Sequence, residues 1–222
     1  PIGTSYYYKV RPFDSNMLES DSNTAVVTRT VTIGVGATPS SPMRYWISLP
    51  YNNTYTSALD VINDTPSTVT TIETYNALTN GWDRYTRGVG GTNFAINKGT
   101  ALQVWVTGST NLLLAGSHDP NFAFNLTYVS GDTNEFFVSV PYNANYTDAL
   151  SIVNQINNNL NPGAGGTVDR IRRLNGTTQA YETLYWRYSP LNYWDGINFS
   201  FVPGESYMIR VISNTSWRPS TY

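Results

Sequence analysis

The only histidine of the chain, His118, is the first residue to consider for catalysis. A nucleophilic triad needs a histidine beside both a hydroxyl nucleophile and a carboxylate. Asp119 follows directly, but adjacent side chains usually point apart, and the sequence lacks a Gly-x-Ser-x-Gly turn that would present a serine. We therefore interpret His118, Asp119 and Pro120 as a structural connection between two parts of the chain.

Paired carboxylates are a second source of chemistry, because two of them about 5–10 Å apart can hydrolyse glycosidic bonds. The chain has 15 acidic residues, and none recurs in a pattern that indicates a pair. In the internal repeat described below, Asp148 aligns with Ser57 and Glu205 with Thr100, so these acids are not kept between the copies. We interpret the acids as solvated surface, and we predict no catalytic residue and no enzymatic activity.

Metal and phosphate ligands are equally sparse. The chain has no cysteine, which excludes disulfides and thiolate-bound metals. The best calcium candidate combines Asp14, Asn16, Glu19 and Asp21, although a polar turn has the same composition. The stretch 88–91 lacks the Lys-Ser/Thr pair of a phosphate-binding glycine loop. The sequence therefore predicts neither a metal nor a cofactor.

Aromatic rings provide a third possibility, because a flat apolar face can stack on a sugar. The densest aromatic clusters lie in residues 185–188 and 192–195. In strands, however, such rings more often form cross-strand pairs or core. Polysaccharide is thus a candidate partner. The candidate glycan-stacking residues are Trp186, Tyr188, Tyr193 and Trp194.

The composition favours an extracellular or cell-surface protein. Charged residues make up only 13% of the chain, about half of the usual share, so the polar surface must come from Asn, Thr and Ser. A net charge of −2 without a basic patch argues against nucleic acid as a partner. No apolar run approaches the ~20 residues of a transmembrane segment. The chain opens with Pro1 and without a signal peptide, which we interpret as the mark of a processed product.

A duplicated stretch organises the whole chain. Residues 46–59 match residues 137–150 at an offset of 137 − 46 = 91, and residues 93–99 match 198–204 at an offset of 198 − 93 = 105. Since the offset grows by 105 − 91 = 14, the second copy carries an insertion between the two matches. The repeat predicts two modules, each large enough for its own core.

Alternating apolar residues predict that each module consists mainly of strands. Each module also contains one short helix, for which Thr56 and Thr147 are the expected N-caps. A leading strand precedes each module, in residues 24–35 and again in residues 122–128. The other expected strands are residues 45–49, 69–75, 82–86, 93–96, 101–107, 136–140, 168–174, 181–188, 198–201 and 206–212.

The N-terminal residues are similar to a known hairpin. Residues 3–10 read Gly-Thr-x-Tyr-x-Tyr-x-Val, and an Asp-Ser-x-x-x-Glu-Ser turn follows. Residues 3–35 thus resemble the last hairpin of a fibronectin type III domain, which implies a tyrosine corner at Tyr6 and inward-facing Tyr8 and Val10. The first five strands of that family are missing, and a lone hairpin is marginal in water. We expect the hairpin to pack on upstream sequence, on the next module or on another chain.

The two modules resemble β-modules of large bacterial surface proteins, for which the resemblance implies no defined activity. We expect an all-β fold with two short helices, in which tandem duplicated β-sandwich-like modules follow an N-terminal β-hairpin. The expected domains are the hairpin and linker in residues 1–42, copy one in residues 43–119, and copy two with its leading strand in residues 120–222.

These observations favour a non-enzymatic extracellular structural protein, either a segment of a surface protein or a subunit of a fibre or surface layer. Its partners would be further copies of itself or neighbouring domains of a longer chain. Strand addition through the N-terminal strands would supply main-chain hydrogen bonds, and a head-to-tail contact of this kind gives filaments. The alternative hypothesis is a carbohydrate-binding adhesion module. The expected assembly strand contains Val27, Val31, Ile33 and Val35.

Overall fold

The computed structural model describes residues 27–221 and confirms an all-β fold with two short helices. Two five-stranded sheets dominate it, with the strand orders β2-β6-β3-β4-β5 and β9-β13-β10-β11-β12. Two further sheets have two strands each, β1-β7 and β8-β14. The calcium candidate in residues 14–21 and most of the fibronectin-like segment lie outside the described residues.

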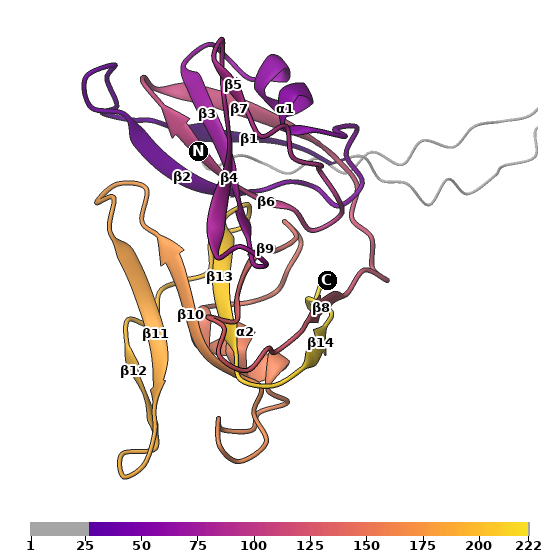
Figure 1. Ribbon diagram of the computed structural model, residues 1–222, viewed down its shortest axis with the longest axis vertical. Coiled ribbons are helices and arrows are strands. Elements are labelled where there is room, and N and C mark those ends of the chain that lie inside the picture. The colour runs from indigo at the N-terminus through magenta and orange to yellow at the C-terminus, as the bar shows by residue number, and fades with distance from the viewer. Residues whose placement is uncertain (1–26, 222) are drawn as a thin grey trace, which may run out of the picture.

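Copy one contains β1 (Val27–Ile33), β2 (Met43–Ser48), α1 (Ala58–Asp64), β3 (Val69–Asn76), β4 (Gly81–Thr86), β5 (Gly90–Gly91), β6 (Ala101–Val106) and β7 (Thr110–Gly116). Copy two contains β8 (Phe124–Leu126), β9 (Glu135–Ser139), α2 (Ala149–Ile156), β10 (Val168–Leu174), β11 (Tyr181–Arg187), β12 (Tyr193–Gly196), β13 (Ser206–Val211) and β14 (Thr215–Trp217). The two copies therefore have the same order of elements. In Figure 1, copy one (indigo to magenta) lies above copy two (orange to yellow).

The leading strands belong to the modules that follow them. All seven residues of β1 pair antiparallel with β7, the last strand of copy one. In the same way, β8 pairs with β14, the last strand of copy two. Each copy thus closes on itself by joining its first strand to its last. The described part of the segment 1–42 is in this sense a structural part of copy one.

The pairing register locates the insertion in copy two. Ile72 of β3 pairs with Val104, and Ile171 of β10 pairs with Ile209, so β10 follows β3 at an offset of 171 − 72 = 99. The insertion of 14 residues therefore divides into 99 − 91 = 8 residues between α2 and β10, and 105 − 99 = 6 residues after β11. The second part extends the β11-β12 hairpin by two residue pairs, Trp186 with Trp194 and Arg187 with Tyr193, and adds two residues to its turn.

Both helices begin one residue later than expected. The N-caps are Ser57 and Asp148, and not Thr56 and Thr147. In copy one, the Ser57 hydroxyl accepts from the N–H of Asp60, and the Asp60 carboxylate accepts from the N–H of Ser57. In copy two the same reciprocal capping box is made with the residue types exchanged, Asp148 with Ser151. Asp148 is therefore a cap and not merely a solvated acid.

This cap gives a first prediction. Ser57→Ala and Asp148→Ala should each lower the free energy of unfolding by about 1 kcal/mol, because each leaves a helix N–H without its acceptor. Urea denaturation measures the difference. Thr147→Ala is the matched control, since this exposed residue lies one position outside the helix cap, and it should leave stability unchanged. An equal loss from Thr147→Ala would contradict the assignment of the cap.

Each large sheet has an inner face that packs on its helix. In copy one, Val61 and Ile62 of α1 lie in a buried cluster with Val104 of β6. In copy two, the neighbouring β13 residues Tyr207 and Ile209 face an equivalent cluster around α2, whose members include Ile152, Val153, Val168 and Ile171. Side chains alternate along a strand, so the residues between these point to the outer face of each sheet, where the two copies meet.

Candidate functional site: the interface between the two copies

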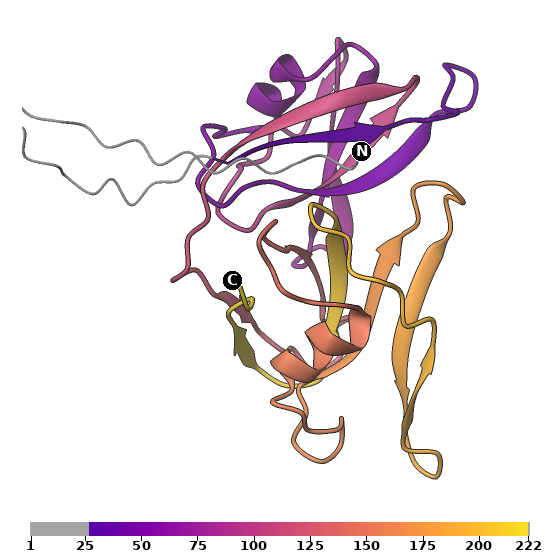
Figure 2. The same ribbon diagram turned by 180° about the vertical axis from the view of Figure 1, so that it is seen from behind.

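The interface between the copies forms around the repeated sequence Ser-x-Pro-Tyr. This sequence ends β2 as residues 48–51 and ends β9 as residues 139–142. Ser48 and Ser139 are both fully buried, and so are Gly99 and Gly204, which follow the repeated Asn-Phe stretch. Figure 2 shows the same arrangement from behind, with copy one and copy two in contact along the middle of the molecule.

Backbone hydrogen bonds cross the interface twice in opposite directions. The N–H of Ser48 donates to the carbonyl of Gly204 at 2.8 Å, and the N–H of Ser139 donates to the carbonyl of Gly99 at 3.3 Å. Ser139 is the equivalent of Ser48, and Gly204 is the equivalent of Gly99, by the offsets of 91 and 105 established above. One contact is therefore made reciprocally by equivalent residues. Such reciprocity is the signature of a two-fold relation, here inside a single chain.

The tyrosines of the repeated sequence add a second reciprocal pair. The Tyr51 hydroxyl donates to the carbonyl of Ser139 at 3.0 Å, and the Tyr142 hydroxyl donates to the carbonyl of Ser48 at 2.5 Å. The serine hydroxyls complete the interface, since Ser48 Oγ accepts from the N–H of Val140 and Ser139 Oγ donates to the carbonyl of Leu49. These bonds satisfy polar groups that are buried at the interface.

The reciprocal tyrosines give a second prediction. Tyr51→Phe and Tyr142→Phe should each cost about 1–2 kcal/mol of stability, because each leaves a carbonyl at the interface without its donor. The double variant should lose close to the sum. Thermal denaturation of the three variants tests this, with Tyr193→Phe as a control on an exposed strand edge. Unchanged stability in both single variants would show that the two bonds do not hold the copies together.

Aromatic rings from both copies pack edge-on or tilted at the centre of the interface. Trp46 meets Phe137, its equivalent at the offset of 137 − 46 = 91, with ring centroids 4.9 Å apart. Trp46 also lies 5.5 Å from Tyr181 of copy two, and Phe137 lies 5.3 Å from Trp82 of copy one. Tyr181 and Trp82 hold equivalent places on β11 and β4, opposite Leu174 and Tyr75. A residue touches its own equivalent only near the axis, so the pseudo-two-fold axis passes beside Trp46 and Phe137.

A buried carboxylate supports the Trp46 side of this cluster. Glu73 of β3 is only 1% exposed. Its Oε2 accepts from Trp105 Nε1 at 2.6 Å and from the side-chain amide of Gln103, and its Oε1 accepts from Arg84 Nε at 2.5 Å. Gln103 in turn accepts from Trp46 Nε1 at 2.8 Å. This chain of hydrogen bonds fixes the Trp46 ring at the axis.

Hairpin ends reach across to the opposite copy on both sides. The side chain of Gln179, in the turn between β10 and β11, accepts from the N–H of Arg44 and donates to its carbonyl. In copy one the equivalent turn between β3 and β4 carries Asn80, which donates to Asp132 and accepts from Thr133 at the start of copy two. Both Asn80 and Gln179 have positive φ.

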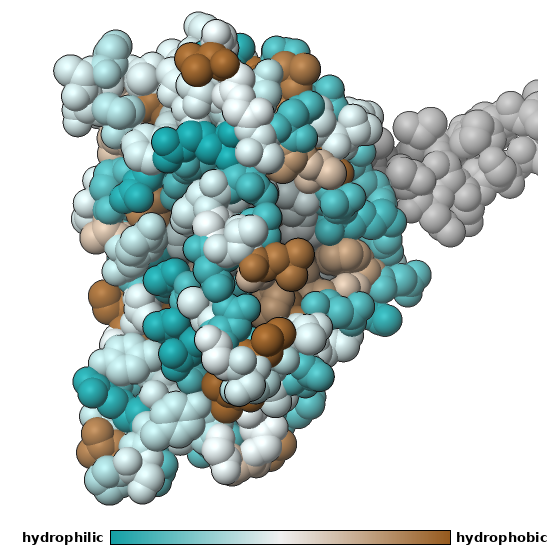
Figure 3. Space-filling model, viewed as in Figure 1, coloured by the Kyte–Doolittle hydropathy of each residue, from teal (hydrophilic) through white to brown (hydrophobic). Residues whose placement is uncertain are grey.

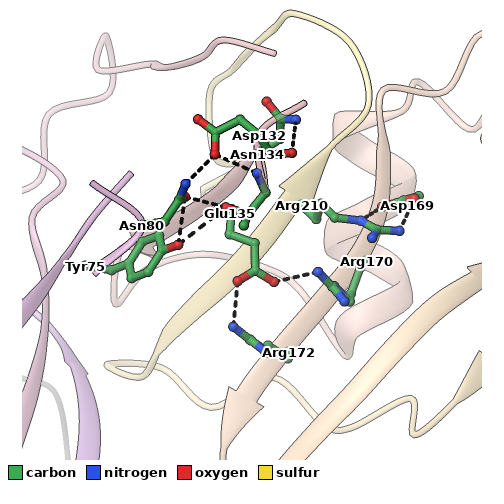
Figure 4. A network of polar contacts seen from close by, with 10 residues as sticks. Tyr75, Asn80, Asp132, Asn134, Glu135, Asp169, Arg170, Arg172 and Arg210 are labelled. Carbon is green, nitrogen blue, oxygen red and sulfur yellow. Dashed lines mark hydrogen bonds and ion pairs between the residues drawn. The ribbon is translucent and has the colours of Figure 1, made fainter. Parts of the chain in front are cut away.

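An ion-pair network lies next to this contact, on the outer face of the five-stranded sheet of copy two (Figure 4). Glu135 of β9 binds Arg170 at 2.6 Å and Arg172 at 2.7 Å, and Asp169 holds Arg210 through two bonds. Glu135 is shared by two arginines, so the three arginines of the network exceed its two carboxylates by one positive charge. The network ties strands β9, β10 and β13 to one another.

The residues of the expected assembly strand have different surroundings. Ile33 is buried in the core of copy one, and Val31 packs against that core. Val35 lies beyond β1 and is 70% exposed. Val27 pairs in register with Gly116, so one edge of β1 is already occupied by β7 along its whole length. A neighbouring chain would need a different edge of this two-stranded sheet.

The four candidate glycan-stacking residues do not form a single platform. Trp186 is only 6% exposed and contacts Trp194 edge-on at 5.5 Å, and Trp194 packs against the core of copy two. Tyr188 and Tyr193 are 45% and 47% exposed and lie at the ends of β11 and β12. All four rings lie in residues 186–194, the stretch that contains the six-residue part of the insertion. Trp186 is buried, Trp194 is partly buried, and the two exposed tyrosines lie beside the turn.

His118 lies in the connection between the copies, as its sequence position predicts. Its ring lies 5.7 Å from the ring of Tyr51, and the next ring contact of Tyr51 is Phe122 at 4.6 Å. Neither nitrogen of His118 has a hydrogen-bond partner among the described residues, and burial lowers its pKa. No hydroxyl or carboxylate is bonded to the ring, so His118 packs the connection against copy one.

Buried tyrosines give a third prediction, on alkaline pH. Burial raises the pKa of Tyr51 and of Tyr207, and it raises the pKa of Tyr146 from 10.0 to about 12. A pKa raised by folding means that stability is intact below the unfolded value and is lost as the pH rises toward the folded value. The melting temperature should therefore fall between pH 10 and about pH 12, as circular dichroism can show. A constant melting temperature over this range would contradict burial of these hydroxyls.

Figure 3 shows polar and weakly polar residues over most of the viewed face, with apolar residues in small separate groups. Within residues 27–221, no three His, Asp or Glu side chains come together in a way that could hold a metal ion. In the same part of the chain, neither helix is long and apolar enough to cross a membrane.

No family model, curated protein or solved structure matches the chain.

Sequence reasoning located the repeat but missed the interface that the repeat builds. The signal was present, because Ser48, Pro50 and Tyr51 all recur as Ser139, Pro141 and Tyr142. A serine and a tyrosine kept between copies on either side of a strand-ending proline indicate a shared contact. That the contact joins the two copies to one another depends on their arrangement in space.

Proposed function

We propose that this chain is a non-enzymatic extracellular structural protein, a segment of a surface protein or a subunit of a fibre or surface layer. The observation that carries the proposal is the reciprocal interface, in which the buried Ser-x-Pro-Tyr sequences join the two modules through hydrogen bonds in both directions. A rigid two-module unit suits a role in bearing load or setting spacing. The ion pairs of Glu135 and Asp169 with arginines of copy two also suit a structural role, since they tie the strands of its sheet to one another.

The expected partners are further copies of the chain or neighbouring domains of a longer chain. Their surfaces would be the open strand edges outside the interface, since edges offer main-chain donors and acceptors for strand addition. A polar exterior with few charges is compatible with close packing of copies, because little like-charge repulsion has to be overcome.

Two measurements on the full chain test this proposal. Negative-stain electron microscopy, with light scattering over a range of concentrations, should show regular fibres or sheets, or a concentration-dependent growth in mass. Small-angle X-ray scattering of the unassembled chain should fit a single rigid body. A chain that stays monomeric at every concentration and whose two modules move independently would overturn the proposal.

A glycan-binding adhesion module is the second candidate, and the exposure of Tyr188 and Tyr193 favours it. Binding would then use only these two rings, beside the lengthened turn that copy one lacks. In a glycan screen, Tyr193→Ala should reduce binding about tenfold, because one stacked ring contributes roughly 1–3 kcal/mol, as base–aromatic stacks do. Tyr128→Ala, which removes another exposed ring of copy two, is the control. Equal binding by both variants would remove this candidate.

A further inference from the structure

The second edge of β7 is the most informative feature outside the interface. One edge of β7 pairs with β1. Ser117, directly after β7, directs both its N–H and its carbonyl to Asn52, away from β1. Backbone groups alternate in direction along a strand, so Asn111, Leu113 and Ala115 present theirs on the same side as Ser117. Within residues 27–221, these backbone groups have no hydrogen-bond partner on that side.

Copy two shows how the equivalent edge is covered. The stretch 110–116 matches 215–221 at the offset of 215 − 110 = 105, which places Arg218 at Leu113 and Ser220 at Ala115. In copy two, Gln155 of α2 donates to the carbonyl of Arg218 at 3.2 Å, and the Tyr146 hydroxyl accepts from the N–H of Ser220 at 2.8 Å. The helix side of copy two thus satisfies the edge of its last strand.

Copy one does not make these bonds. At the offset of 91, Asp64 stands in place of Gln155 and Tyr55 in place of Tyr146. An ionised carboxylate has no hydrogen to donate to a carbonyl, so Asp64 cannot take the role of Gln155. The Tyr55 hydroxyl donates to Asp64 at 2.5 Å, as the Tyr146 hydroxyl donates to Gln155, but within residues 27–221 it accepts no N–H from β7. Leu112 replaces the larger Trp217, whose indole bonds Gln155 in copy two.

The result is a groove of about 250 Å³ between β7 and the end of α1. Buried apolar side chains form its floor, and Asp64, Thr65 and Pro66 form its rim. Leu113 is 62% exposed beside it. An unpaired strand edge next to an apolar groove is the geometry of a site that accepts an added strand. The floor residues are Ile47, Val61, Leu112 and Leu114.

We propose that this edge of β7 accepts residues 6–11 of a second copy of the chain as an additional strand. Tyr6, Tyr8 and Val10 would cover the apolar floor, while Lys9 and Arg11 would lie near the carboxylate of Asp64 at the rim. These six residues lie outside the described part of the chain, and their alternation is that of a strand. The inference deepens the proposed function, on which it rests, by naming the donor and acceptor of strand addition.

The path of the chain favours a second copy over the same copy. Residue 27 pairs with Gly116 on the edge of β7 opposite to the groove. A strand that precedes β1 therefore reaches the groove of a neighbour without crossing its own β1-β7 pair. Donor and acceptor are different surfaces, so the contact is head-to-tail and continues from copy to copy.

Substitutions in the full chain test the acceptor edge. Leu113→Pro removes an N–H that points into the groove and leaves the bonds to β1 in place, so association should disappear. Leu113→Thr is the matched control that keeps the N–H. Asp64→Lys should weaken association about tenfold by replacing an attraction with a repulsion. Asn63→Lys places the same charge one residue away from the groove rim and should associate as the unchanged chain does.

A charge exchange makes the test specific. Adding Lys9→Glu and Arg11→Glu to Asp64→Lys should restore association, because the donor and the rim again carry opposite charges. Sedimentation velocity over a range of concentrations reads out every variant, and circular dichroism shows whether each is folded. If Leu113→Pro unfolds, the charge series still decides the question.

The outcomes separate this inference from the proposed function. Association of the unchanged chain that both Leu113→Pro and Asp64→Lys leave intact would overturn the β7 site and keep the structural role. A strand of the same copy in the groove, shown by a compact monomer that Leu113→Pro destabilises, would also overturn it. Failure of the unchanged chain to assemble at any concentration would overturn the β7 site. The proposed function would fall with it only if the two modules also moved independently in small-angle scattering.

Discussion

Glu73→Ala should lower the free energy of unfolding by about 2–4 kcal/mol, because the buried amide of Gln103 loses its acceptor and a cavity opens where the side chain was. The carboxylate is 1% exposed and accepts hydrogen bonds from Gln103, Trp105 and Arg84. Removing it leaves the buried amide of Gln103 and the partly buried indole of Trp105 without an acceptor, whereas Arg84 is 59% exposed and becomes solvated. The Trp46 ring would also lose its support, because Gln103 holds its indole nitrogen.

Two further variants make this measurement specific. Glu73→Gln keeps the shape of the side chain and should cost less than the alanine variant, since one amide oxygen can still accept. Asp195→Ala breaks the exposed ion pair with Arg187 and should cost less than about 1 kcal/mol. Guanidinium denaturation followed by tryptophan fluorescence measures all three. A loss of less than about 1 kcal/mol in Glu73→Ala would show that the network does not stabilise the sheet.

Trp46→Ala should destabilise the chain by about 3–5 kcal/mol and should also uncouple the two copies. Trp46 is 3% exposed and contacts Phe137, Tyr181 and Trp82, so its ring belongs to both copies at once. With the ring removed, the cores of the two copies remain complete, because neither contains Trp46. Differential scanning calorimetry should then show two unfolding transitions where the unchanged chain shows one.

Trp217→Ala provides the matched control for uncoupling. Its ring is 2% exposed and belongs to the core of copy two alone. This variant should lower the free energy of unfolding by a similar amount. The destabilisation should affect the core of copy two and leave the interface between the copies in place. A single transition in Trp46→Ala, lowered in temperature as in Trp217→Ala, would show that the interface does not depend on the aromatic cluster.

The repeat made much of the fold predictable. Alternation in the sequence identified most strands of both sheets, and the offsets of 91 and 105 identified which residues face each core. The expected strands at residues 93–96 and 198–201 are instead isolated bridges, because Ser57 and Asp148 each contact them at a single residue. The strand β12 was not expected, since its alternation is short and Gly196 ends it.

The caps were misplaced by one residue because two adjacent hydroxyl residues compete for the position. Thr56 and Ser57 are both suitable caps, and only the acid at Asp60 decides between them, since a capping box needs a partner three residues on. The interface could not be predicted from the sequence for a different reason. Glu73 finds its partners 11 to 32 residues away along the chain, and sequence alone does not show that a central strand glutamate is buried.

The exchanged capping boxes also say something about the history of the duplication. The capping boxes make the same two hydrogen bonds with the residue types exchanged, Ser57 with Asp60 and Asp148 with Ser151. A change at one position alone would therefore give either two serines or two aspartates. A serine pair is neutral and can still exchange both bonds, whereas an aspartate pair would place two negative charges within one helical turn. An alignment of the two copies that scores each position separately would count these two substitutions as differences, although together they preserve one capping box.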